Sequence, residues 1–163
     1  MIALLTVLVL PLIVIPACTS VAPTQESTAA FSDVEGKEWF LSEIKSAGKN
    51  ITIDRKKFEA DNMAGFFSIT FGKDKATNEN RLSGMGAPNR YFGPYTAGSD
   101  RSLNIGNLAS TLMMPFKEPD EIKEYEYFQY ISKATRWNLR EGKLELSTLS
   151  SDGKEAVLVF ACK

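Results

Sequence analysis

The sequence predicts an α+β fold: a single domain with a curled antiparallel β-sheet and one main helix packed against it. Strand patterns fill the first part of the domain, one long helical pattern follows, and hairpin patterns close the chain, with no βαβ alternation. The 163 residues are 44% hydrophobic and 24% charged, which is typical of one globular domain. No repeat at a fixed period and no long internal linker divides the chain.

Alternating apolar residues predict strands in the first half of the domain, because residues two apart lie on the same face of a strand. The alternating positions are Trp39 and Leu41, then Phe67, Ile69 and Phe71, then Leu103 and Ile105. Residues 51–53 (ITI) are a brief strand, and residues 54–61 (DRKKFEAD) are expected to form one helical turn.

The segment 118–135, EPDEIKEYEYFQYISKAT, is predicted to be the main helix. Pro119 suits the first helical position, and the acidic residues after it complement the positive end of a helix. The apolar residues that recur near helical spacing are Ile122, Tyr125, Phe128 and Ile131. Residues 124–130 also alternate as a strand would, but the whole segment exceeds the usual strand length of about 4–8 residues.

Three further strands are expected to close the sheet as hairpins. They are residues 136–140 (RWNLR), 144–150 (LELSTLS) and 155–162 (EAVLVFAC). The dipeptide Asp152-Gly153 between the last two is a strong hairpin signal. Cys162 is interpreted as a small apolar residue at the end of the last strand, with an intermolecular disulfide as the alternative.

Residues 1–17 are predicted to be a lipoprotein signal peptide. Almost every residue from 2 to 15 is apolar, but a membrane-spanning helix needs about 20 apolar residues. The run ends in Ile15-Pro16-Ala17-Cys18, which resembles the bacterial lipobox, in which the cysteine receives the lipid. Pro16 is unusual at its position and no basic residue precedes the run, so the alternative is an uncleaved anchor or an ordinary signal peptide beside a chance cysteine.

Residues 18–35 are predicted to be a flexible tether from lipidated Cys18, and residues 36–163 the folded domain. The tether is rich in Ser, Thr, Ala and Pro and has too few large apolar residues to order itself. Two or more acyl chains would hold Cys18 stably in a membrane. Thr19 stands where an Asp would favour the inner membrane, so we expect the outer membrane, with the domain facing the periplasm or the surface.

Groups that carry common enzyme chemistry are scarce in this sequence. The absence of His excludes Ser-His and Cys-His nucleophile pairs and most zinc sites. A net charge of −1 argues against a nucleic-acid partner, because such binding needs concentrated positive charge. We therefore expect no enzyme activity, no cofactor and no metal site.

Two weaker chemical patterns have plainer explanations. Acidic residues cluster on the predicted helix, where a solvated face explains them better than a catalytic carboxylate pair. They are Asp120, Glu121, Glu124 and Glu126. The glycines at 84, 86 and 93 are followed by no Lys-Ser or Lys-Thr, so they do not form a phosphate-binding loop.

Four segments in order resemble the META/HslJ family of small bacterial envelope proteins. They are residues 36–44 (GKEWFLSEI), 66–72 (FFSITFG), 83–95 (SGMGAPNRYFGPY) and 103–115 (LNIGNLASTLMMP). The resemblance covers about residues 36–162 and implies roles in envelope stress or at the cell surface, without an established reaction. Pro88 and Pro115 lie where the family often has cysteines, so no disulfide or thiol role of those cysteines carries over.

Within the stretch 81–95, five residues match family positions that would shape a tight strand–loop–strand corner. They are Ser83, Gly84, Asn89, Tyr91 and Tyr95. We expect Gly and Asn to supply positive φ angles there. A ligand site in the same loop is the alternative interpretation.

These observations favour a non-enzymatic, lipid-anchored cell-envelope protein, a stress- or envelope-related module that binds or protects an envelope protein partner. Its contact with the membrane would be through Cys18. An alternative is a binder of small apolar ligands with a cavity between the sheet and the helix, because Phe and Tyr are abundant at inward positions. An enzyme is a third hypothesis.

Overall fold

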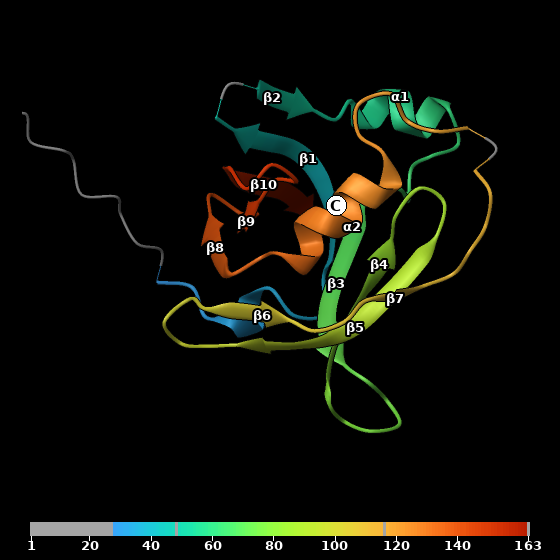
Figure 1. Cartoon of the computed structure of the whole chain (residues 1–163). Coiled ribbons are helices and arrows are strands. Elements are labelled where there is room, and N and C mark those ends of the chain that lie inside the picture. Colours follow the sequence, from blue (N-terminus) through green and yellow to red (C-terminus); the bar gives the residue numbers. More distant parts are fainter. Residues whose placement is uncertain (1–27, 48, 116, 163) are drawn as a thin grey trace, which may run out of the picture.

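A computed structural model describes residues 28–47, 49–115 and 117–162 (Figure 1). The predicted signal peptide and Cys18 therefore lie outside the described residues. The helices and strands in chain order are η1 (Phe31–Asp33), β1 (Glu38–Ser46), β2 (Lys49–Thr52), α1 (Arg55–Ala60), β3 (Ser68–Lys73), β4 (Asn80–Met85), β5 (Arg90–Ala97), β6 (Leu103–Ile105), β7 (Ala109–Ser110), α2 (Glu124–Ser132), β8 (Arg136–Arg140), β9 (Lys143–Leu149) and β10 (Glu155–Cys162).

The strands form one antiparallel sheet that curls into a nearly closed barrel. Its strand order is β6-β5-β4-β3-β1-β10-β9-β8, with β2 paired to β1 and β7 paired to β5. The two ends of this order approach each other, because Leu103 N donates to Thr135 O at 2.8 Å and Trp137 N donates to Arg101 O at 3.0 Å. In Figure 1, α2 lies between the β8–β10 side and the β3–β5 side of the curl. The predicted fold class is confirmed in outline, as a β-rich domain with one longer helix.

The alternating apolar residues point into the core, as predicted. Phe67, Ile69 and Phe71 are fully buried, and Leu103 and Ile105 are buried on β6. Each large side chain removed from water in this way stabilises the fold by about 1.5–3 kcal/mol. Strand β3 begins only after Phe67, whose φ of 55° changes the course of the chain there.

The predicted hairpin turn at Asp152-Gly153 is confirmed, and a second tight turn joins β8 to β9. Gly153, with φ of 79°, lies in the turn between β9 and β10, and Glu141 and Gly142, with φ of 51° and 72°, lie between β8 and β9. Positive φ at successive positions matches the right-handed twist of the paired strands. Cys162 ends β10 as predicted, and its side chain is exposed.

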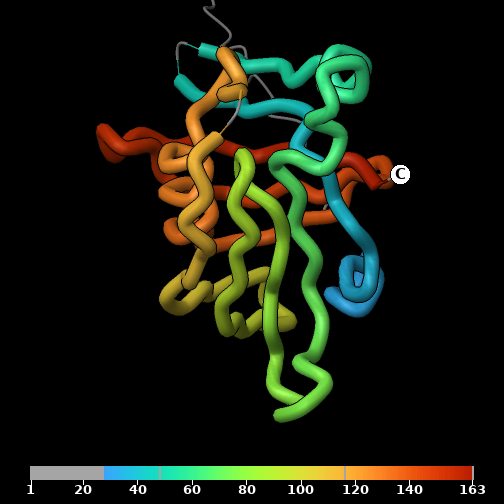
Figure 2. The backbone as a smooth tube through the Cα atoms, turned by 90° about the vertical axis from the view of Figure 1, so that its right-hand side faces the viewer, coloured from blue at the N-terminus to red at the C-terminus, as the bar shows by residue number. Residues whose placement is uncertain are grey.

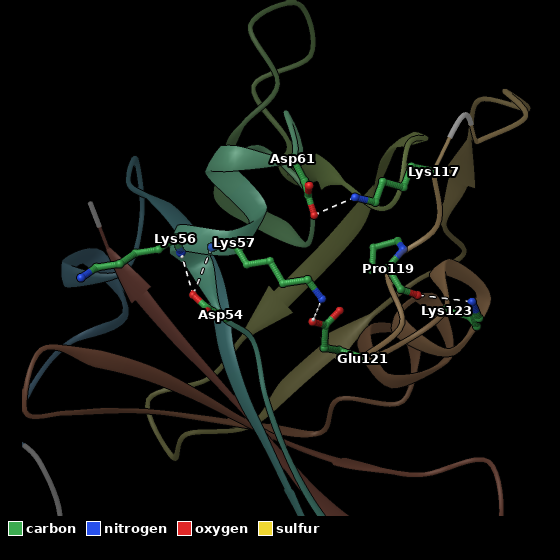
Figure 3. Close-up of polar contacts among 8 residues, drawn as sticks. All are labelled: Asp54, Lys56, Lys57, Asp61, Lys117, Pro119, Glu121 and Lys123. Atoms are coloured by element: carbon green, nitrogen blue, oxygen red, sulfur yellow. Dashed lines mark hydrogen bonds and ion pairs between the residues drawn. The ribbon is translucent and has the colours of Figure 1, made fainter.

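The main helix begins later than the sequence predicts, at Glu124 and not at Pro119. Its first turn is closed by Lys123 N, which donates to the carboxylate of Glu126 at 3.0 Å. Residues before it are held against α1 by an ion pair between Lys57 Nζ and Glu121 Oε1 at 3.2 Å (Figure 3). A second ion pair, between Lys117 Nζ and Asp61 Oδ2 at 2.8 Å, joins the same segment to the end of α1.

The buried face of α2 also differs from the predicted stripe. Tyr125 is 62% exposed, whereas Tyr127 is fully buried together with Ile131. The predicted stripe assumed a helix that includes Ile122, but Ile122 is buried in the segment before α2. The later start of the helix therefore changes which residues of this segment reach the core.

The folded domain starts before Gly36, the boundary that the sequence suggested. Phe31 packs edge-on against Phe71 and Trp137, with ring centroids 5.3 and 5.0 Å apart. Val34 is fully buried. The final part of the expected tether, residues 31–35, is therefore part of the packed domain.

Candidate functional site

The expected corner, residues 81–95, is a hairpin of β4 and β5. The two strands pair in antiparallel register, and the turn closes where Gly86 N donates to Asn89 O at 2.7 Å. Figure 2 shows this hairpin beside β3, with strands running along the length of the domain. Residues 86–89 therefore form a tight turn between two paired strands.

The expectation of positive φ at Gly84 and Asn89 is wrong. Among the described glycines, positive φ occurs at Gly36, Gly142 and Gly153. A Cβ atom added at Gly84 would instead lie 2.0 Å from Ser68 O and 2.9 Å from Cε1 of Tyr91. Glycine is required at this position because backbone and ring approach it closely, and not because of an unusual dihedral angle.

Tyr91 and Tyr127 form a buried phenol pair beside this glycine. Their hydroxyl oxygens are 2.9 Å apart, and they lie 2.9 Å and 3.1 Å, respectively, from Ser68 O. The two hydroxyls have one proton each, which is one fewer than the three contacts. Either both hydroxyls donate to Ser68 O, or one donates to Ser68 O and the other donates to its partner hydroxyl. Burial raises the pKa of Tyr91 well above its usual value and also raises that of Tyr127. Both phenols are therefore neutral in the folded protein at physiological pH.

Asn89 connects the hairpin turn to the segment after β7. Its Oδ1 accepts from Met113 N at 2.6 Å and from Thr111 Oγ1 at 2.9 Å. Its Nδ2 donates to Met113 O at 3.2 Å and to Glu124 Oε2 at 2.7 Å. A side-chain amide offers two donor and two acceptor positions, and all four are used here.

Glu124 fixes the same turn from the first turn of α2. Its Oε1 accepts from Ala87 N, and from Asn89 N at 2.7 Å. The interpretation of the helix acids as a solvated face is therefore wrong for Glu124, which binds the turn, and for Glu121, which pairs with Lys57. The role of Glu124 could not be predicted from local sequence patterns, because its partners lie about 35 residues away along the chain.

The segment held by Asn89 presents three large apolar side chains to solvent. Leu112 is 97% exposed, Met113 60% and Met114 92%. We call residues 112–114 the apolar tip. Its backbone is fixed at Met113 by hydrogen bonds to a buried side chain, so the exposure occurs in a defined conformation.

The other two expected corner residues lie apart from this network. Ser83 is exposed on the outer face of the sheet, paired in register with Phe92. Tyr95 is buried at the far end of β5, where its hydroxyl donates to Glu35 Oε1 at 2.6 Å. Burial, followed by the bond to Glu35, raises the pKa of Tyr95. The structure thus brings together Gly84, Asn89 and Tyr91, but not all five residues.

Aromatic rings fill the interior between the sheet and α2. The ring of Phe67 lies 5.1 Å from that of Tyr127 and 6.0 Å from that of Phe58. Phe128 lies 5.1 Å from Tyr91. This packing gives no support to the hypothesis of an apolar ligand between sheet and helix.

A comparison with protein families covers most of the described domain. A model of the META domain matches residues 32–161. The chain belongs to the META domain family. This match confirms the META/HslJ resemblance, and it begins beside Phe31, where the packed domain starts. A comparison with curated proteins gives no match.

Two solved structures share the fold of this META domain. The NMR structure of a protein from Burkholderia xenovorans has a TM-score of 0.62 and 21% identity, over 93% of this chain and 99% of that chain. The crystal structure of a DUF4847 family protein from Bacteroides vulgatus has a TM-score of 0.50 and 17% identity, over 80% of this chain and 95% of that chain. At such identities the likeness concerns the fold and not the function. Within the described part of this chain, no helix is long and apolar enough to cross a membrane.

Proposed function

We propose that this META domain protein is a non-enzymatic, lipid-anchored module of the bacterial cell envelope that binds a protein partner through its apolar tip. The observation that carries the proposal is the exposure of Leu112, Met113 and Met114 in a fixed loop. Consecutive large apolar side chains held in water are unfavourable unless another surface covers them. A partner that buried the tip would gain apolar contact without ordering the loop first.

Leucine and methionine suit a role in partner binding. Methionine side chains are flexible and polarisable, so they adapt to an irregular apolar groove on a partner. The tip is also attached to the core, since Asn89 joins it to Glu124 and the helix. A displacement of the tip by a bound partner would therefore be transmitted through Asn89 to the β4–β5 turn and to α2.

The membrane attachment rests on the sequence alone. Cys18 ends a lipobox-like stretch, and residues 19–30 between it and the packed domain could span at most about 40 Å. An anchored domain with that reach would meet partners in or near the membrane. We propose the outer membrane, with the domain facing the periplasm or the surface, because Thr19 follows the cysteine.

Metabolic labelling tests the anchor. Cells that express the full chain are fed an alkyne fatty acid, and the wild type is compared with Cys18→Ala. We expect label in the wild type alone, in the outer-membrane fraction. Equal labelling of both proteins would contradict the anchor, and label confined to the inner membrane would contradict the placement.

Site-specific crosslinking tests the tip. A photoreactive amino acid at position 112 is compared with one at Leu149, which is 41% exposed on a different part of the domain. We expect a discrete crosslinked protein from position 112 alone, which Met114→Ser should weaken. The same products from both positions, or none from position 112, would contradict partner binding by the tip.

A further inference from the structure

A second surface, separate from the apolar tip, lies on the outer face of β3, β4 and β5. Neighbouring residues along a strand point to opposite faces, so the residues between the buried ones project outward. Ile69, Phe71 and Leu82 are fully buried on the inner face. On the other face, a hollow of about 680 Å³ is lined by residues of all three strands. This volume lies within the range of about 300–1,000 Å³ that is usual for small-molecule sites.

The floor of this outer hollow is small and polar. Thr70 and Ser83 are directly paired across β3 and β4, and Gly72 lies two residues further along β3. No hydrogen bond joins the hydroxyls of Thr70 and Ser83 to another described residue. A Cβ atom at Gly72 would meet nothing within 4 Å, so the glycine leaves space above the floor.

The rim of the hollow carries more positive than negative charge, although the whole chain has a net charge of −1. The basic lining residues are Lys73, Lys75, Arg81 and Arg90, and the acidic ones are Glu38 and Asp74. Asp74 is already compensated by an ion pair with Arg81 and by N–H groups of the following turn. Lys73, Lys75 and Arg90 form no ion pair with any described residue. After the Arg81–Asp74 pair is set aside, three cations and the single carboxylate of Glu38 remain, so the rim is positive and suits a negative ligand.

Arg81 and Phe92 form a ridge at one side of this hollow. The guanidinium carbon of Arg81 lies 4.0 Å from the ring centroid of Phe92. The same two residues line a second hollow of about 320 Å³, which Asn80 and Asn107 also line. A ligand built of repeated polar units could continue from one hollow to the other across this ridge.

The outer hollow lies over the central strands of the sheet, and this position disfavours an extended peptide as its ligand. β3 is paired with β1 and β4, and β4 is paired with β3 and β5, so their backbone groups are already bonded. An extended peptide gains affinity mainly from a free strand edge, which the central strands of this surface do not offer. A ligand here must be recognised by side chains: hydroxyls on the floor and cations on the rim.

We propose that the outer hollow binds a carboxylated oligosaccharide. Sugar hydroxyls would pair with Thr70 and Ser83. Carboxylates on different sugar units would form charge-assisted hydrogen bonds with Lys75, beside the β3–β4 loop, and with Arg90, at the opposite end of β4. The exposed part of the Phe92 ring would face the apolar side of a sugar ring, and the chain would continue toward the second hollow. This site requires neither the apolar tip nor the lipid anchor.

Calorimetry with trigalacturonate as the probe tests the proposal on the full chain in a neutral detergent. Maltotriose, which is of similar size but neutral, is the ligand control. We expect binding of the acid and at least about ten-fold weaker binding of maltotriose. No binding of trigalacturonate at millimolar concentration, or equal binding of both sugars, would overturn the proposal.

Two kinds of variant locate the site. Gly72→Val fills the hollow and leaves the charge unchanged, and a β-branched residue suits a strand. Lys75→Gln with Arg90→Gln removes rim charge, whereas Lys49→Gln with Lys143→Gln removes the same charge elsewhere. We expect Gly72→Val and the Lys75→Gln, Arg90→Gln variant to bind trigalacturonate about ten-fold more weakly than the wild type. The Lys49→Gln, Lys143→Gln control should keep the dissociation constant of the wild type. Wild-type affinity in both hollow variants would overturn the assignment.

A vesicle-binding experiment distinguishes a sugar-binding site from a membrane-binding surface. Vesicles of phosphatidylglycerol are offered to the wild type and to the Gly72→Val variant, with and without trigalacturonate. The proposal expects vesicle binding, if any occurs, to be indifferent to both Gly72→Val and the sugar. Binding that occurs with vesicles alone and is lost in Gly72→Val would identify a lipid headgroup site and overturn the proposal. Melting curves confirm that Gly72→Val is folded.

Discussion

The side-chain amide of Asn89 donates to the carboxylate of Glu124 over 2.7 Å, and this contact joins the β4–β5 turn to the first turn of α2. The same amide holds Met113 by both backbone groups. Three segments distant in sequence therefore meet at one side chain, which is 6% exposed. Buried amides with every position satisfied are sensitive to substitution, because each lost partner leaves an unpaired polar group.

We expect Asn89→Asp to destabilise the domain by about 1–3 kcal/mol at neutral pH. The change removes both donors of the side chain and places a second carboxylate beside Glu124. Urea unfolding measures the loss, and the slope of the transition should not change. Asn104→Asp, at an exposed position of β6, is the matched control. Equal midpoints for the two variants would show that the Asn89 network does not stabilise the fold.

Gly84→Ala should destabilise the domain by about 1–3 kcal/mol through overpacking. Its added carbon would overlap Ser68 O and the ring of Tyr91, and the carbonyl belongs to a paired strand that cannot easily move. Gly72→Ala is the control on the neighbouring strand, where the added carbon meets open space. We expect Gly72→Ala to leave stability unchanged or to raise it. A comparison of urea midpoints decides the matter, and equal losses would contradict the close-approach explanation.

The strands were predictable because their signal is local. Alternation at Phe67, Ile69 and Phe71, and the turn at Asp152-Gly153, depend on residues within a few positions of one another. Burial then follows from the pattern, since one face of a strand must cover the core. The family resemblance depended on the same short segments, and the family match agrees with it.

The helix start and the role of the acids were not predictable because their causes are distant in sequence. Pro119 permits a helix, but the ion pair of Lys57 with Glu121 holds that segment against α1. Glu124 has the sequence pattern of a solvated helix residue, and its partners lie on the β4–β5 turn, about 35 residues away along the chain. The early start of the domain has the same origin, since Phe31 packs against Phe71 and Trp137 from distant strands.

Phe31→Ala should destabilise the domain by about 1–3 kcal/mol, because residues 31–35 belong to the packed domain. The ring makes edge contacts with Phe71 and Trp137, and aromatic pairs add about 0.5–1.5 kcal/mol each beyond burial. Thermal melting measures the effect. Tyr125→Ala, which removes a largely exposed ring from α2, is the control and should change little. An unchanged melting temperature for Phe31→Ala would show that residues 31–35 do not stabilise the domain and belong to the tether.

The buried phenols predict a loss of stability at alkaline pH. Burial raises the pKa of Tyr91 and Tyr127 above the value of about 10 that applies in the unfolded chain. Their contribution to the free energy of unfolding is fully present below about pH 10. It is lost as the pH rises from there through the raised folded values, because the unfolded chain releases protons that the folded chain retains.

Replacing both phenols by phenylalanine should therefore flatten this pH dependence. At neutral pH the double variant Tyr91→Phe, Tyr127→Phe should lose about 1–3 kcal/mol, because Ser68 O loses its hydroxyl partners. Tyr91→Phe alone should lose less, since Tyr127 can still donate to that carbonyl. Urea unfolding between pH 8 and about pH 11 compares these proteins with Tyr125→Phe, an exposed control. If the double variant lost stability with pH as steeply as the control, the phenol pair would not be the source of the alkaline sensitivity.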